Sequence, residues 1–184
     1  MNAPSTASSA GQQQLAGALA LIREIPDFPE PGVLFRDLGP VFADGPAFHA
    51  LIDGLVATLD PATDVLVAVE ARGFLLGAAV AQAAGLGVVP VRKPGKTPLV
   101  AHRVEYALEY GTNALELPEG LLAKGQRAVI IDDVLATGGT VAASVELVEY
   151  VGAEVLSVSV VMELAALGGR RLLANREITA LLTM

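Results

Sequence analysis

The stretch from Val129 to Thr140, with the sequence Val-Ile-Ile-Asp-Asp-Val-Leu-Ala-Thr-Gly-Gly-Thr, decides the fold of this chain. Its first three residues are β-branched and apolar without alternation, as expected for a strand buried on both faces. Two carboxylates follow where that strand would leave its sheet, and a run of small and hydroxyl residues follows them. Apolar residues then recur at helical spacing up to Gly152, which predicts a helix with a glycine C-cap. This order predicts a βα unit with a ligand site at its turn.

The small residues at this turn suit an anion. Gly138 and Gly139 can direct backbone N–H groups toward a phosphate, and Thr137 and Thr140 add hydroxyl donors. No Gly-Lys-Ser/Thr follows, so this is not a Walker A loop, and the spacing excludes a dinucleotide fingerprint. An ordinary βα turn with Thr140 as N-cap is the alternative. The acidic pair favours a ligand, because two carboxylates would repel the anion unless they held sugar hydroxyls of the same molecule. We therefore expect a ribose 5-phosphate unit.

Two further charged turns follow predicted strands. The strand 64–69 leads to Glu70-Ala71-Arg72-Gly73 and a helix over 74–84, and the strand 88–92 leads to Arg92 and Lys93. Arg72 at a helix start costs about 0.5 kcal/mol unless an anion lies there. Strands that alternate with helices predict a parallel sheet, whose ligands bind beyond the carboxyl ends of the strands. We therefore expect all three charged turns to meet at one edge, although a solvated loop also explains the basic cluster by itself.

The stretch 129–140 resembles the signature of the type I phosphoribosyltransferases, which bind 5-phosphoribosyl 1-pyrophosphate (PRPP). The resemblance implies that Asp132 and Asp133 hold the ribose hydroxyls. It implies that the 5′-phosphate lies in a loop formed by Ala136, Thr137, Gly138, Gly139 and Thr140. The turn at 70–74 resembles the family's pyrophosphate loop. The pyrophosphate-binding set is then expected to comprise Glu70, Ala71, Arg72, Gly73, Arg92, Lys93 and Lys96.

The choice of base is indicated by residues 25–38, a proline-rich segment that we expect to be irregular. It resembles the N-terminal motif of the adenine phosphoribosyltransferase family, in which residues matching Leu34 and Phe35 contact the purine. The family places Val134 on the other side of the base. Glu109 matches the family's candidate acid/base residue. From chemistry alone, Phe35 could instead pin a loop to the core, and Glu109 could be a solvent-facing hairpin residue.

The resemblance covers residues ~14 to 184 and implies conversion of adenine and PRPP to AMP and pyrophosphate, as in purine salvage. The transition state would resemble an oxocarbenium ion, and Mg²⁺ would be carried by PRPP with no direct protein ligand. The implied fold is α/β, a central mainly parallel sheet flanked by helices, with a small hood and a mobile loop and hairpin over 94–117. A homodimer is also implied. The sequence Leu99-Val100-Ala101-His102-Arg103 departs from the family, which commonly has a glycine in that loop.

Composition limits the alternatives. The 184 residues suit one domain, expected over 14–184 after a loose tail at 1–13. The chain has no cysteine, and its net charge of −8 disfavours nucleic acid as a partner. No apolar run reaches the ~18 residues that span a bilayer, so no membrane partner is expected and the cytoplasm is the expected location. The remaining expected elements are helices over 12–24, 46–59 and 164–173, a hairpin over 104–117, and strands over 154–161 and 178–183.

Two other classes of function stay open. The first is a regulator that binds PRPP without catalysis, although nothing in the sequence resembles an added DNA-binding region. The second is a phosphoribosyltransferase for a 6-oxopurine. Such enzymes usually hold the 6-oxo group with a lysine or arginine, whereas the segment around Phe35 offers an apolar slot.

Overall fold

The computed structural model describes residues 9–107 and 112–184 of the chain. It consists of two compact units, residues 1–57 and residues 58–184, and each is described by itself. Within the described ranges, no helix combines the length and the apolar character needed to cross a membrane.

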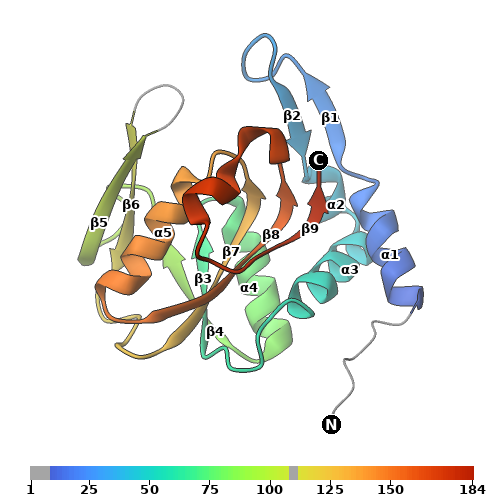
Figure 1. Cartoon of the computed structure of the whole chain (residues 1–184). Helices are drawn as coiled ribbons and strands as arrows, with labels where there is room; N and C mark the ends of the chain where they lie inside the picture. The colour runs from blue at the N-terminus through green and yellow to red at the C-terminus, as the bar shows by residue number, and fades with distance from the viewer. Residues whose placement is uncertain (1–8, 108–111) are drawn as a thin grey trace. The chain divides into compact units, whose positions relative to one another are not determined.

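The first unit is helical with one small hairpin (Figure 1). Its elements are α1 (Ser9–Leu19), β1 (Arg23–Pro26), β2 (Leu34–Asp37), α2 (Gly39–Ala43) and α3 (Gly45–Val56). Asp44 caps α3 by accepting a hydrogen bond from the Ala47 amide at 2.8 Å. The first helix was expected over 12–24 after a loose tail at 1–13, but α1 already begins at Ser9 and ends at Leu19, and the residues from Arg23 onward pair with β2 instead.

The expectation of an irregular segment over 25–38 is confirmed for residues 27–33 but wrong at the two ends of the segment, which are strands. Strands β1 and β2 pair antiparallel, with Arg23 opposite Asp37 and Pro26 opposite Leu34. The prolines do not prevent this pairing, because Pro26 is the last residue of a strand and the other two prolines lie in the connecting loop. An ion pair of 2.6 Å between Arg23 and Asp37 joins the two strands.

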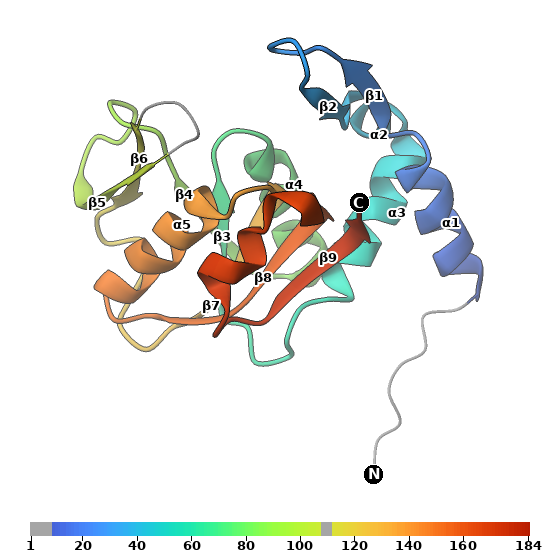
Figure 2. The ribbon, with the colours of Figure 1, turned by 45° about the horizontal axis from the view of Figure 1, so that its top comes forward.

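The second unit is built on a five-stranded parallel sheet with the order β4-β3-β7-β8-β9. Its strands and main helices are β3 (Val65–Val69), α4 (Arg72–Ala84), β4 (Gly87–Val91), β7 (Arg127–Leu135), α5 (Gly139–Tyr150), β8 (Glu154–Glu163) and β9 (Ile178–Thr183). The connection from β3 runs to one side of the sheet and that from β7 to the other. Right-handed crossovers then place α4 and α5 on opposite faces, as Figures 1 and 2 show. The expected α/β fold with a central parallel sheet is confirmed.

Burial explains why these strands are continuous apolar runs. All five residues of β3 are buried, and Ile130 and Ile131 of β7 are fully buried between the helical layers. Helix α4 lies close to the sheet at Gly77, where an added Cβ would stand 2.5 Å from the Cβ of Ala68. Glycine at this position therefore sets the distance between helix and sheet.

A separate antiparallel hairpin is formed by β5 (Val100–Ala107) and β6 (Thr112–Pro118) beside α5 (Figure 1). It begins at residue 100, so part of the basic loop expected over 94–103 is a strand. The short helix expected over 164–173 is two 3₁₀ turns, η1 (Ala165–Leu167) and η2 (Gly169–Leu173). Gly168 separates the two turns with a φ of +68°, a conformation that suits glycine.

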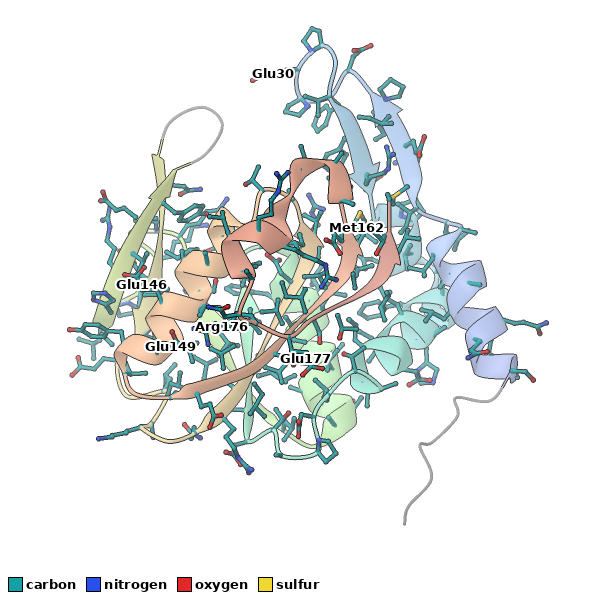
Figure 3. The ribbon with its side chains drawn as sticks, viewed as in Figure 1. Glu30, Glu146, Glu149, Met162, Arg176 and Glu177 are labelled. Atoms are coloured by element: carbon teal, nitrogen blue, oxygen red, sulfur yellow. The ribbon has the colours of Figure 1, made fainter. Side chains whose placement is uncertain are left out.

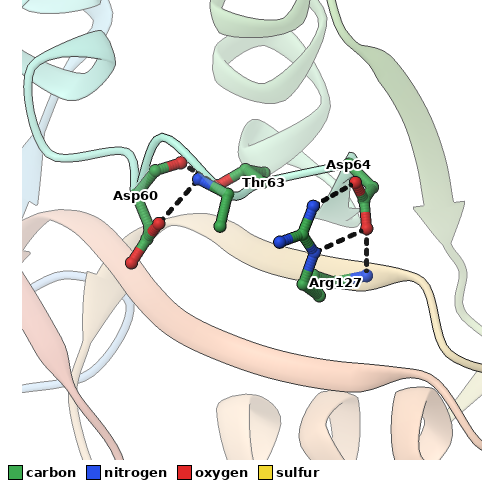
Figure 4. A network of polar contacts seen from close by, with 5 residues as sticks. Asp60, Thr63, Asp64 and Arg127 are labelled. Carbon is green, nitrogen blue, oxygen red and sulfur yellow. Dashed lines mark hydrogen bonds and ion pairs between the residues drawn. The ribbon is translucent and has the colours of Figure 1, made fainter.

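Ion pairs join segments at the edge opposite the charged turns. Asp64, just before β3, accepts three hydrogen bonds of 2.8–2.9 Å from the side chain and amide of Arg127, the first residue of β7 (Figure 4). Arg176 and Glu149 form an ion pair of 2.7 Å between the segment before β9 and α5 (Figure 3). These contacts fix the ends of neighbouring elements in register.

Candidate active site

A pocket of about 320 Å³ lies beyond the carboxyl ends of β3 and β7. These two strands are neighbours, and the chain leaves them toward opposite sides of the sheet, so the pocket occupies the topological switch point. The expected site residues that line it come from three turns: Glu70, Ala71 and Arg72 after β3, Lys93 after β4, and Asp132, Asp133, Val134, Ala136, Thr137, Gly138, Gly139 and Thr140 from β7 onward. The three charged turns therefore meet at one edge of the sheet, as expected.

The acidic pair lies within β7 rather than after it, since the strand continues to Leu135 and pairs with β8 over that length. Asp132 and Asp133 are only 7% and 8% exposed. Burial, together with the neighbouring charge of Asp133, raises the pKa of Asp132 well above its ordinary value. The Asp133 carboxylate accepts a hydrogen bond from the Arg72 guanidinium. Two acidic side chains are thus held at the pocket wall, where hydroxyl groups are suitable hydrogen-bond partners.

The small-residue loop leads directly into α5, which begins at Gly139 with Gly138 as its N-cap. No side chain caps this helix. The alternative in which Thr140 is the N-cap is therefore wrong, because Thr140 is the second helical residue and its hydroxyl donates to the Tyr106 hydroxyl. The backbone amides of the first turn of α5 lie at the positive end of the helix dipole, which suits the binding of an anion in the pocket.

Backbone from η2 supports this loop from behind. At Gly138, whose φ is +88°, an added Cβ would stand 2.7 Å from the Gly169 carbonyl oxygen. The residue after Gly169, Arg170, anchors η2 to the sheet. Its Nε donates to both Glu163 carboxylate oxygens at 2.8 Å, and its Nη1 donates to the Ile178 carbonyl. Nothing in the local sequence pattern pointed to this backing, because it joins segments thirty residues apart.

The basic residues divide into two groups. Arg72 and Lys93 line the pocket, whereas Arg92 and Lys96 do not. Lys96 pairs with Glu70 at 2.5 Å, and the Arg92 guanidinium donates to the Lys96 carbonyl at 2.7 Å.

Glu70 therefore organises the basic loop. Its side chain is 8% exposed and also accepts a hydrogen bond from the Lys93 amide at 2.8 Å. Burial alone would raise the pKa of Glu70, but the hydrogen bonds from Lys96 and the Lys93 amide lower it below its ordinary value. A negative Glu70 suits an anchor for cations better than a direct ligand of pyrophosphate.

Gly73 has a packing position rather than a place in the pocket lining. An added Cβ at Gly73 would stand 3.0 Å from Asp132 Oδ1 and from the Ile131 carbonyl oxygen. The absence of a side chain lets the start of α4 lie directly against the acidic pair. Gly73 thus controls the distance between the expected pyrophosphate turn and the expected ribose site.

Sequence reasoning missed four lining residues: Tyr106, Asn113, Leu135 and Val141. Tyr106 on β5 and Asn113 on β6 stand opposite each other in the hairpin register. Alternation along the two strands could have predicted that both face the same side, but not which side.

The expected base site is described only in part. Leu34 and Phe35 lie on β2 of the first unit, where Leu34 is 44% exposed and Phe35 makes an edge-to-face contact with Phe28 at 5.1 Å between ring centroids. Glu109 lies outside the described residues.

The model of the phosphoribosyl transferase domain family matches residues 42–172, more than half of the chain. The chain therefore belongs to the phosphoribosyltransferases.

The relatives define the branch of this family. The chain is 59% identical over 170 residues to an adenine phosphoribosyltransferase of Saccharopolyspora erythraea, covering 92% of each chain. The crystal structure of adenine phosphoribosyltransferase from Thermoanaerobacter pseudethanolicus is similar with a TM-score of 0.89 at 47% identity, covering 92% of this chain and 99% of that one. The Saccharomyces cerevisiae enzyme, complexed with an imino-altritol bisphosphate and adenine, has a TM-score of 0.85 at 37% identity, covering 94% and 99%. The branch is that of the adenine phosphoribosyltransferases.

Proposed function

We propose that this protein transfers the 5-phosphoribosyl group of PRPP to adenine, releasing AMP and pyrophosphate, with residues 14–184 as the catalytic unit. The observation that carries the proposal is the meeting of an acidic pair, a glycine-rich helix start and two cationic side chains at one pocket. These groups match the three parts of PRPP: ribose hydroxyls, 5′-phosphate and pyrophosphate. The names of the relatives supply the base.

The two ends of PRPP would be held by different parts of the wall. The amides and hydroxyls of residues 136–140 bind the 5′-phosphate, and the carboxylates of Asp132 and Asp133 accept hydrogen bonds from the ribose 2′- and 3′-hydroxyls. Arg72 and Lys93 attract the pyrophosphate at the opposite end. Arg72 also contacts Asp133, so a residue proposed to bind the pyrophosphate is paired with one proposed to bind the ribose.

The reaction then breaks the bond between C1′ and the pyrophosphate oxygen while N9 of adenine bonds to C1′. Positive charge grows on the ribose ring, and negative charge grows on the departing pyrophosphate. In this assignment the carboxylates of β7 bind the ribose and the cations bind the leaving group, so the charges of the pocket would favour this separation. Clamping both phosphoryl ends also keeps C1′ in line with the base.

Mg²⁺ fits this site as an ion carried by the substrate. Among residues 9–107 and 112–184, no three carboxylate or imidazole groups cluster as a metal cage. Mg²⁺ usually keeps several waters and binds mainly through substrate phosphates, and the carboxylates that line this pocket are those of Glu70, Asp132 and Asp133. When bound, Mg²⁺ would neutralise charge on the pyrophosphate.

The base and its proton are assigned by resemblance. We propose that Leu34, Phe35 and Val134 contact adenine, of which Val134 lines the pocket. Glu109 is proposed to take the proton that leaves the imidazole ring of adenine as N9 bonds to C1′. A homodimer and a cytoplasmic location are further proposals that rest on the family.

The test is to incubate the purified protein with PRPP, Mg²⁺ and one purine at a time, and to separate the products by chromatography. AMP from adenine, with no IMP or GMP from hypoxanthine or guanine, supports the proposal. Formation of IMP or GMP at a comparable rate would instead assign the protein to the 6-oxopurine class. PRPP binding without any nucleotide product would indicate a regulator.

A further inference from the structure

We propose that Tyr106 is a positioning residue for the 5′-phosphate, because its hydroxyl lies where it can direct the proton of Thr140 toward that group. The inference rests on the proposed function, since it takes residues 136–140 as the 5′-phosphate loop. It adds a residue of the β5–β6 hairpin to a site otherwise formed by the turns of the sheet.

The geometry joins two elements at the pocket wall. Tyr106 lies on β5 and Thr140 is the second residue of α5, and both line the pocket. The Thr140 hydroxyl donates to the Tyr106 hydroxyl oxygen at 3.3 Å. The Tyr106 ring packs against the apolar core. Its position is therefore fixed by packing, while its polar end reaches the site.

Proton accounting gives the pair a function. A hydroxyl has one proton to donate and two lone pairs to accept with, whereas a phosphate oxygen can only accept. The single proton of Thr140 cannot serve Tyr106 and a phosphate at once. If Tyr106 donates to Thr140 Oγ1 instead, the proton of Thr140 turns to the phosphate and both hydroxyls keep a partner. The distance of 3.3 Å between the two hydroxyl oxygens is longer than the usual 2.7–2.8 Å of such hydrogen bonds. It can therefore shorten when Tyr106 donates to Thr140 and Thr140 donates to the phosphate.

The other contacts of Thr140 leave this role to Tyr106. Ser144 donates to the Thr140 backbone carbonyl at 2.9 Å, which leaves the side-chain hydroxyl untouched. Asn113, the register partner of Tyr106, accepts a hydrogen bond from the Ala114 amide at 2.9 Å, and no hydrogen bond among the described residues joins it to Thr140. Within the described residues, the Thr140 hydroxyl therefore has Tyr106 as its side-chain partner.

The experiment is a double-mutant cycle with Tyr106→Phe and Thr140→Val. Both changes keep the shape of the side chain and remove only a hydroxyl. Calorimetry would measure the Kd for AMP and for ribose 5-phosphate, with pyrophosphate as the ligand for the other end of the site. Steady-state assays would give the KM for PRPP and kcat. Tyr150→Phe is the matched control, because Tyr150 lies at the exposed end of α5 and its ring stacks on His102.

We expect Tyr106→Phe to weaken AMP and ribose 5-phosphate by about fivefold, as for loss of one hydrogen bond, and to raise the KM for PRPP similarly. Pyrophosphate affinity and kcat should stay within about twofold, as expected for uniform binding energy. In the Thr140→Val background, Tyr106→Phe should have no further effect, because the proton it directs is gone. Tyr150→Phe should change none of these values.

Additive effects of the two changes would overturn the inference, as would a Tyr106→Phe variant with unchanged affinity for AMP. Equal weakening of pyrophosphate would also overturn it, because the loss would then be general. A wild-type protein that forms no AMP refutes the proposed function instead. The two failures are distinguishable, since ribose 5-phosphate binding is measured without adenine.

Discussion

Substitution of Gly138 by alanine tests how the phosphate loop is supported. The added Cβ would stand 2.7 Å from the Gly169 carbonyl oxygen and 3.1 Å from the Gly169 Cα, on the η2 side of the loop. These are backbone atoms, and they cannot rotate away as the end of a side chain can. The loop must therefore move relative to η2, and this displaces the amides expected to bind the 5′-phosphate.

Two costs add at this position. The φ of +88° lies in the left-handed region, where a side chain costs about 1–2 kcal/mol. Forcing atoms into a filled site costs about 1–3 kcal/mol more. Gly138→Ala should therefore lower the free energy of unfolding by about 2–5 kcal/mol, or the melting temperature by about 2–4 °C for each kcal/mol. The affinity for PRPP should fall together with stability.

Gly120→Ala is the matched control. Gly120 has a φ of +74°, but an added Cβ would meet nothing within 4 Å, so only the conformational cost of about 1–2 kcal/mol applies. Urea denaturation of both variants separates the cost of packing from that of conformation, and calorimetry with PRPP follows the loop. If Gly138→Ala were no more destabilising than Gly120→Ala and bound PRPP normally, the backing of the loop by Gly169 would be refuted.

Three further outcomes are expected. Asp132→Asn should weaken PRPP at least about tenfold by calorimetry while raising the melting temperature at pH 7. The pKa of Asp132 is raised in the folded state, so ionisation of this buried carboxyl destabilises the fold as pH rises, and asparagine removes that cost. A lower melting temperature for the variant at pH 7 would contradict this sign. Phe35→Ala should raise the KM for adenine by about ten- to a hundredfold and spare PRPP; the opposite pattern would refute the base assignment. Hydrogen bonds from Arg127 lower the pKa of Asp64 to about 2, so the stability that this carboxylate contributes is present above pH ~4 and is lost as pH falls toward 2. Asp64→Asn should therefore destabilise the protein to urea at pH 7 and much less at pH 2, and an equal loss at both pH values would contradict the assignment.

Local sequence determined the frame of the second unit. The apolar runs at 64–69, 129–131 and 154–161 became strands, and the glycines at 85 and 152 lie just beyond the ends of α4 and α5. These features follow from side-chain periodicity and backbone freedom, which act over a few residues. The charged turns could be assigned to one edge for the same reason, because parallel strands present all their carboxyl ends together.

Tertiary structure alone decided how the site is completed. The acidic pair is part of β7 because β8 pairs with it, and Arg72 contacts Asp133 because β3 lies beside β7. In the first unit, β1 pairs with β2 in a proline-rich segment that was predicted to be irregular.

Long sequence separations explain why these features escaped prediction. Gly138 and Gly169 are thirty-one residues apart, and Tyr106 and Thr140 are thirty-four apart. Whether such residues touch depends on how whole elements pack, since each local pattern is equally compatible with other partners. The sequence by itself therefore determined the acidic pair, the small-residue loop and the two cations that line the pocket, and packing of β5, α5 and η2 decided which further groups line and orient them.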